Sequence, residues 1–142
     1  MENNKVILSA DDNNENVEFT MENAYELDYV KSLIRDGIVQ VKMPIKVKCN
    51  HSELSMINKY LTLMKDNESE EDYKKFHNDL FSIENESKME KFFNFIRCAH
   101  YLRAYNILEK STTYIANEIN DCESKDEICK KFNIPEILIE DN

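Results

Sequence analysis

Three segments in the first fifty residues carry the pattern of β-strands. Residues 5–10 are mostly apolar, and residues 16–21 place apolar side chains at every second position after a polar turn. This arrangement predicts a β-hairpin. Residues 39–48 alternate in the same way, with Pro44 among them. Because proline has no amide hydrogen to donate, we expect the third strand at a sheet edge or broken at Pro44.

The segment between the second and third strands has helical spacing. Asn23 is followed three residues later by Glu26, a capping-box arrangement that marks the start of a helix. Apolar side chains from Leu27 to Ile34 form a stripe, and Gly37 is the residue type that often ends a helix in a left-handed conformation. We therefore expect a single helix between Asn23 and Gly37.

Two further segments lead to the C-terminal part of the chain. Asn50 and Glu53 repeat the capping spacing, and two apolar stripes within residues 54–64 predict a helix that is buried on two sides. The charged run 66–75 predicts an exposed connecting loop. The apolar positions within residues 76–83 indicate a short amphipathic segment.

The last fifty residues predict amphipathic helices. Ser87–Ala104 and Asn106–Asn120 have apolar residues at helical spacing, and Ser124 with Glu127 caps a shorter helix that ends at Phe132. Among the phenylalanines of the first of these helices we expect Phe95 to lie nearest an edge of the core. The whole order of elements indicates an α+β domain, in which helices cover a small sheet.

The net charge and the lengths of the apolar runs exclude two classes of binding partner. The 142-residue chain has a net charge of −10 and an isoelectric point of about 4.8. Such a surface repels phosphate backbones, so we expect no nucleic-acid partner. No apolar run approaches the roughly 20 residues that span a bilayer, so we expect no membrane partner. The polar N-terminus is unlike a secretory signal, and the four cysteines are expected as free thiols in a reducing compartment.

The sequence contains no pattern that indicates catalysis or a cofactor. Gly37 is the only glycine, whereas loops that cradle phosphates need several. The cysteines lack the close paired spacing of zinc sites. The three histidines, His51, His77 and His100, lie on separate predicted elements and adjoin no nucleophile motif. We therefore expect a protein that is not an enzyme, with no catalytic residues, no metal site and no cofactor.

Three stretches of the C-terminal half resemble a known protein family. They are Cys-Ala-His-Tyr-Leu at 98–102, Ile-Ala-Asn-Glu-Ile at 115–119, and Asp-Glu-Ile-Cys-Lys-Lys-Phe-Asn-Ile at 126–134. Together with the order of elements, they resemble the S-phase-kinase-associated adaptor of SCF ubiquitin ligases, a member of the BTB/POZ superfamily. The family's patterns read roughly A-A-N-Y-L, V-A-N-M-I and E-E-I-R-K-x-F-N-I, and the resemblance covers about residues 5–135.

The resemblance implies a BTB/POZ fold in residues 1–105 and a C-terminal helical F-box-binding extension in residues 106–142. It also implies the role of an adaptor subunit of an SCF-type cullin E3 ubiquitin ligase, in the cytoplasm and nucleus. Such an adaptor bridges a cullin and an F-box substrate receptor in ubiquitin-dependent protein degradation. An F-box protein and a cullin are therefore the expected partners.

The family's contact positions map onto two sets of residues. The F-box-binding set would be Leu108, Thr112, Ile115, Ile119, Ile128, Phe132 and Ile134. The cullin-binding set would be His100 and Tyr101. A stripe such as 108, 112, 115 and 119 is, taken alone, more often ordinary core. With the resemblance, burial by a partner becomes the better interpretation.

Two departures from the family pattern bear on these expectations. His100, a predicted cullin contact, stands where the family has asparagine. The family also continues into a final helix ending in a Trp-Cys pair, whereas this sequence contains no tryptophan, and this second departure favours an alternative. The alternative is a self-associating BTB protein that forms a homodimer, or a decoy that binds a cullin without delivering a substrate.

Overall fold

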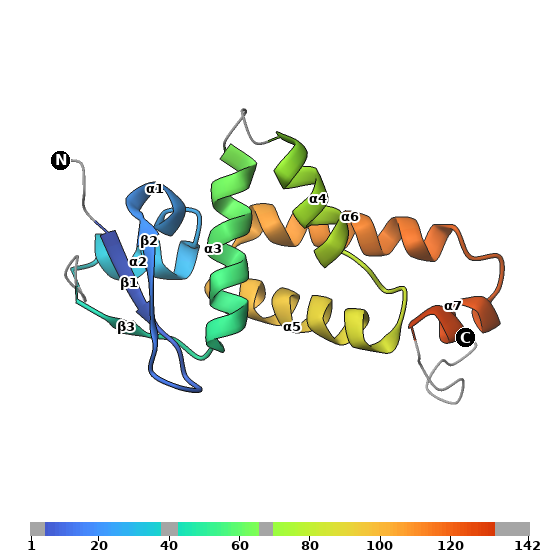
Figure 1. The fold of residues 1–142 in the computed structure, drawn as a ribbon, viewed down its shortest axis with the longest axis horizontal. Helices are drawn as coiled ribbons and strands as arrows, with labels where there is room; N and C mark the ends of the chain where they lie inside the picture. Colours follow the sequence, from blue (N-terminus) through green and yellow to red (C-terminus); the bar gives the residue numbers. More distant parts are fainter. Residues whose placement is uncertain (1–4, 38–42, 66–69, 133–142) are drawn as a thin grey trace.

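The chain folds into an α+β structure, as the pattern predicts. The computed structural model describes residues 5–37, 43–65 and 70–132, which form seven helices and three strands. The sheet and its first helices lie at one end of an elongated molecule, and the last helix lies at the other (Figure 1). One hydrophobic core extends from the sheet through Ile107 to Phe132, the last described residue.

The sheet contains a hairpin and one short edge strand. β1 (Lys5–Ser9) and β2 (Asn16–Thr20) pair antiparallel, which confirms the predicted hairpin. β3 (Ile45–Lys46) pairs in parallel with the other side of β1, giving the order β2-β1-β3. β3 begins directly after Pro44 and lies at the sheet edge, as expected for a strand next to a proline. Residues 39–42, the predicted start of this strand, lie outside the described residues.

The expected single helix between Asn23 and Gly37 is wrong, because the chain forms two helices there. α1 (Met21–Ala24) is capped by Thr20, whose hydroxyl accepts the Asn23 amide hydrogen at 3.1 Å. The chain then extends at Leu27, which is fully buried, before α2 (Asp28–Arg35) begins. This break lets Leu27 enter the core. Gly37 does follow α2 with a positive φ of 72°, as predicted.

Asn23 is a buried polar residue that ties α1 to α3 (His51–Lys65). Only 3% of it is exposed. Its side-chain nitrogen donates to the Asn58 oxygen at 3.1 Å and to the Thr62 hydroxyl at 2.9 Å, and its oxygen accepts from the Lys65 ammonium at 3.0 Å. The capping-box spacing therefore marked a residue whose side chain holds two helices together.

Replacing Asn23 with alanine should lower the free energy of unfolding by about 1–3 kcal/mol, because partly buried donors and acceptors on α3 lose their partner. Urea denaturation followed by circular dichroism measures this loss. The matched control is the exposed Asn120→Ala, for which we expect a change within about 0.5 kcal/mol. Equal effects of the two substitutions would show that the Asn23 hydrogen bonds contribute nothing to stability.

The charged run predicted as a loop is partly helical. α4 (Glu70–Leu80) includes residues 70–75, so the loop expectation is wrong there, and residues 66–69 lie outside the described part. The acidic residues 70–72 fall in the first turn, where the helix dipole favours negative charge. Tyr73 and Phe76 pack their rings against Tyr60 of α3, at centroid distances of 5.4 and 6.3 Å.

The C-terminal part consists of α5 (Glu86–Leu102), α6 (Tyr105–Asn120) and α7 (Lys125–Phe132). α5 begins one residue before the predicted Ser87, because the Asn85 side chain caps it by accepting from the Lys88 amide at 2.9 Å. A left-handed Arg103, with φ of 56°, turns the chain from α5 into α6. The predicted α7 cap is confirmed, because the Glu127 amide donates to the Ser124 hydroxyl at 3.2 Å.

Phe95 is not at an edge, and that expectation is wrong. Its side chain is 0% exposed, with ring centroids 6.0 Å from Tyr60 and 6.1 Å from Phe81. Phe92 shares its face of α5 and is equally buried, whereas Phe93 is only half-buried. The period of the helix places positions 92 and 95 on the same side, toward α3 and α4.

Candidate interaction surfaces of helix α6

Helix α6 has one buried face and two flanks of opposite character. Ile107 and Ser111 form the buried face, where the Ser111 hydroxyl donates to the Ile107 carbonyl at 2.9 Å. Successive residues turn by about 100° around a helix, so two other sets of positions lie on either side of this face, roughly half a turn apart. The polar flank consists of Asn106, Lys110, Thr113 and Asn117. The apolar flank consists of Leu108, Thr112, Ile115 and Ile119.

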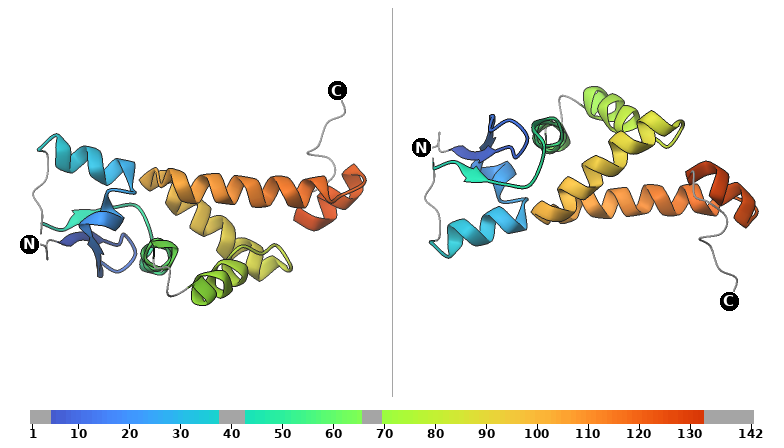
Figure 2. Two further views of the ribbon diagram at one scale, coloured as in Figure 1. Left: turned by 90° about the horizontal axis from the view of Figure 1, so that it is seen from above. Right: turned by 90° about the horizontal axis from the view of Figure 1, so that it is seen from below.

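The apolar flank is the stripe that the sequence predicted as an F-box-binding surface. Leu108 and Ile115 are half-buried and pack against the core. Thr112 is exposed, and Ile119 is 38% exposed. Part of the stripe therefore belongs to the core, whereas Thr112 and Ile119 are exposed. Ile119 lies in the last turn of α6, at the end that Figure 2 shows next to α7.

The predicted contacts on α7 are less accessible than those on α6. Ile128 is half-buried and Phe132 is 9% exposed, while Ile134 lies outside the described residues. Phe132 does reach the surface at one place, where it lines a groove of about 260 Å³ together with Met89 and Phe93 of α5. The sequence placed Phe93 in the core, so it missed this half-buried neighbour of the predicted site.

An ion pair fixes α7 against the end of α6. The Lys131 ammonium lies 3.1 Å from the Glu118 carboxylate and 3.3 Å from the Glu118 carbonyl oxygen, to which it donates. Hydrogen bonding to Glu118 raises the pKa of Lys131. This contact joins α7, which carries Ile128, to the last turns of α6, which carry Ile119.

The two residues predicted to contact a cullin lie at the C-terminal end of α5 and differ in exposure. His100 is exposed. Tyr101 is half-buried, and its ring lies 5.2 Å from that of Tyr29 on α2. Burial and a hydrogen bond to Tyr29 raise the pKa of Tyr101 to about 12. Tyr101 therefore has a packing role against α2, and His100 is the more accessible of the two for a partner.

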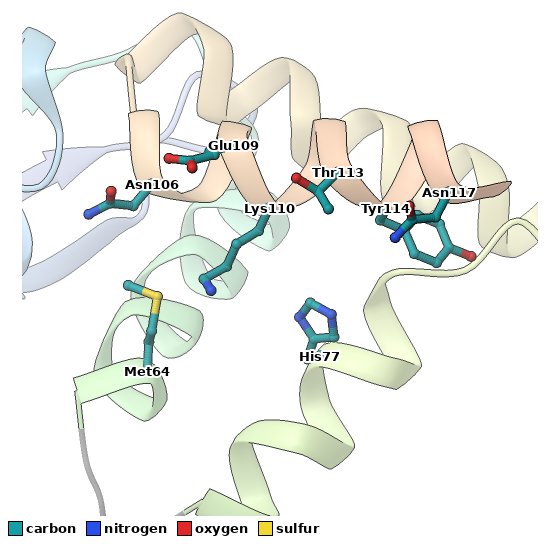
Figure 3. Close-up of a pocket in the computed structure, with 8 residues that line it drawn as sticks. All are labelled: Met64, His77, Asn106, Glu109, Lys110, Thr113, Tyr114 and Asn117. Carbon is teal, nitrogen blue, oxygen red and sulfur yellow. The ribbon is translucent and has the colours of Figure 1, made fainter. Parts of the chain in front are cut away.

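A groove that the sequence did not predict runs along the polar flank of α6. It measures about 630 Å³ and lies between α6, the end of α3 and α4 (Figure 3). Met64 comes from α3, His77 from α4, and the other lining residues from α6. The sequence treated His77 as an isolated histidine, because neither the position of α4 nor its packing beside α6 can be read from residue spacing.

A smaller cavity of about 350 Å³ contains two buried thiols, Cys49 and Cys98. Cys98 is buried in α5, as its helical position predicts. A hydrogen bond to Cys49 and burial raise the pKa of the Cys98 thiol. A thiol in this state is a weak nucleophile, which makes the pair a poor candidate for covalent catalysis.

The chain matches no protein-family model and no curated protein sequence at a significant level. The described ranges contain no cluster of three or more His, Cys, Asp or Glu side chains that could bind a metal ion. In the same part of the chain, every helix is too short or too polar to cross a bilayer.

Proposed function

We propose that this chain is a non-catalytic adaptor of an SCF-type cullin E3 ubiquitin ligase. The observation that carries the proposal is the apolar flank of α6, where Ile119 is 38% exposed in line with Leu108 and Ile115. An aliphatic stripe that begins in the core and continues into solvent is suited to burial by an apolar helix of a partner. An F-box of a substrate receptor is the partner that the sequence resemblance implies.

The arrangement of the elements supports a BTB/POZ assignment. A hairpin, two short helices and a third strand precede the helical cluster, and α6 and α7 extend away from the sheet (Figure 1). The motif residues at 98–102, 115–119 and 126–132 fall at the end of α5, on α6 and on α7. In this proposal the end of α5, with His100, contacts the cullin, and α6 and α7 contact the F-box.

The mechanism would be positional. The adaptor holds the receptor and the cullin together, which raises the effective concentration of the bound substrate near the ubiquitin-charged enzyme. Apolar burial on α6 and α7 supplies the affinity for the F-box. The net charge of −10 contributes to partner choice and to the rate of encounter.

Calorimetry with two separate partners tests the proposal. The full chain is titrated with an F-box protein and, independently, with the N-terminal domain of a cullin. Binding of both is the expected result. Binding of the cullin alone would replace the adaptor role with that of a decoy. Failure to bind either partner would refute the proposed function, and a dimer at low micromolar concentration in sedimentation would then favour self-association.

A further inference from the structure

The groove along the polar flank of α6 has the size of a small-molecule site. Its volume of about 630 Å³ falls within the roughly 300–1,000 Å³ that is typical of ligand pockets. Met64 and Tyr114 provide apolar surface, and Lys110 of α6 and His77 of α4 extend into the groove from opposite sides (Figure 3). The groove therefore combines an apolar wall with two groups that are able to donate hydrogen bonds.

Lys110 is a cation that faces the groove without a counter-ion among the residues placed by the structure. Its lining neighbour Glu109 makes no ion pair with it, and its charge acts on His77. Figure 3 shows the Lys110 side chain extending from α6 into the space between Met64 and His77. A cation beside an imidazole disfavours protonation of that ring, and an anion bound between them would remove this repulsion.

His77 is held in one orientation by contacts on the side away from the groove. Its ring stacks on Phe81 at a centroid distance of 4.0 Å, and its Nδ1 lies 2.8 Å from the Tyr60 hydroxyl. The Tyr60 hydroxyl is also 3.0 Å from that of Tyr73. When Tyr73 donates to Tyr60 and Tyr60 donates to Nδ1, the hydrogen of the neutral ring is on Nε2. In the described structure Nε2 has no protein partner.

We propose that this groove binds a small carboxylic acid with an apolar body. The carboxylate would lie between the Lys110 ammonium and the His77 Nε2–H, and the apolar body would lie on Met64 and Tyr114. One lysine and one neutral imidazole match the single charge and two acceptor oxygens of a carboxylate. The proposal concerns the flank opposite the F-box surface and is independent of the adaptor function.

The affinity for such an acid should increase as the pH falls. Burial, followed by the charge of Lys110, lowers the pKa of His77 in the free protein, so the ring is neutral at pH 7. A bound carboxylate favours the protonated ring and raises this pKa, so binding takes up a proton between the two pKa values. The ionisable groups around the ring are Lys110, Glu109 and Tyr114 of α6, Tyr60 of α3 and Tyr73 of α4.

Proton NMR of the full chain, titrated with hexanoate, tests this proposal. The chain has three histidines, and His51 and His100 lie outside the groove, so they serve as internal references. Hexanoate should shift the ring resonance of His77 in a saturable manner and raise the pKa of His77, with little change at the other two. Hexanamide, which has the same apolar body without the charge, should bind at least about tenfold more weakly.

A pair of lysine variants completes the test. Lys110→Met should weaken hexanoate binding about tenfold or more, because the charge-assisted hydrogen bond is lost. Lys88→Met removes a lysine of α5 that is paired with Glu84, away from the groove, and should leave binding unchanged. Equal binding of hexanoate and hexanamide, equal effects of the two variants, or equal shifts of all three histidines would each overturn the proposal. Circular dichroism checks that each variant is folded.

Discussion

Replacing Phe95 with alanine should lower the free energy of unfolding by about 3–5 kcal/mol. Phe95 is 0% exposed, and its ring lies near those of Tyr60 and Phe81, where α3, α4 and α5 meet. Removing the ring deletes its buried apolar area and leaves a cavity that the neighbouring rings fill only partly. Because small domains have a total stability of about 5–15 kcal/mol, this is the largest loss we expect from a single substitution.

Urea denaturation of Phe95→Ala and Phe93→Ala provides the comparison. Both variants remove the same side chain from the same helix, so their helix propensities change alike. Phe93 is half-buried and lines the groove beside Phe132, so its replacement should cost less than half as much. If the Phe93 variant were the less stable of the two, the orientation of α5 in the structure would be wrong.

Replacing Ile119 with aspartate should weaken F-box binding by at least about 30-fold, equivalent to roughly 2 kcal/mol. This expectation rests on the proposed function. Ile119 is 38% exposed, so the substitution places a charge in the apolar contact without disturbing the core. Phe132→Asp would be a poorer test, because Phe132 is 9% exposed and its replacement would also destabilise the fold.

Asn117→Asp is the matched control for Ile119→Asp. Both substitutions add one negative charge to the last turns of α6, where the helix dipole disfavours it equally. Asn117 is exposed on the polar flank, away from the apolar stripe. Calorimetry should show unchanged F-box binding for this variant. Equal weakening in both variants would indicate a general charge effect and would exclude the apolar flank as the contact.

Local signals in the sequence predict several elements of this fold correctly. Alternation predicts the hairpin, and the position of Pro44 predicts an edge strand. Gly37 has the positive φ that its place after a helix requires, and Ser124 caps α7. For Gly37 and Ser124 the deciding interaction lies within a few residues of the signal, so tertiary packing does not override it.

The errors arise where contacts between distant residues decide the structure. The Asn23 side chain binds α3 instead of capping a helix, and the chain breaks before α2 so that Leu27 is buried. Residues 70–75 are helical, and Tyr73 among them packs against Tyr60, a contact that the charged composition does not indicate. Burial of Phe95 depends on the side from which α3 and α4 approach α5.

The difference between local signals and contacts of distant residues also applies to the candidate sites. The apolar flank of α6 follows from the helical period alone, so the sequence predicts that Leu108, Ile115 and Ile119 lie on one side of the helix. Its partial burial depends on the neighbouring helices. The groove on the polar flank joins Met64, His77 and α6, three elements whose relative positions are set by packing. No spacing of residues along the chain indicates such a groove.

The packing of α6 determines how its two flanks influence each other. Ile107 is 0% exposed and Ser111 is 2% exposed, so this face of α6 is packed into the interior and resists rotation of the helix about its axis. A rigid helix between two sites transmits no preference from one to the other, because neither ligand selects between alternative positions of the helix. A receptor and a carboxylate would therefore bind α6 with additive free energies, and a saturating concentration of one would leave the dissociation constant of the other unchanged.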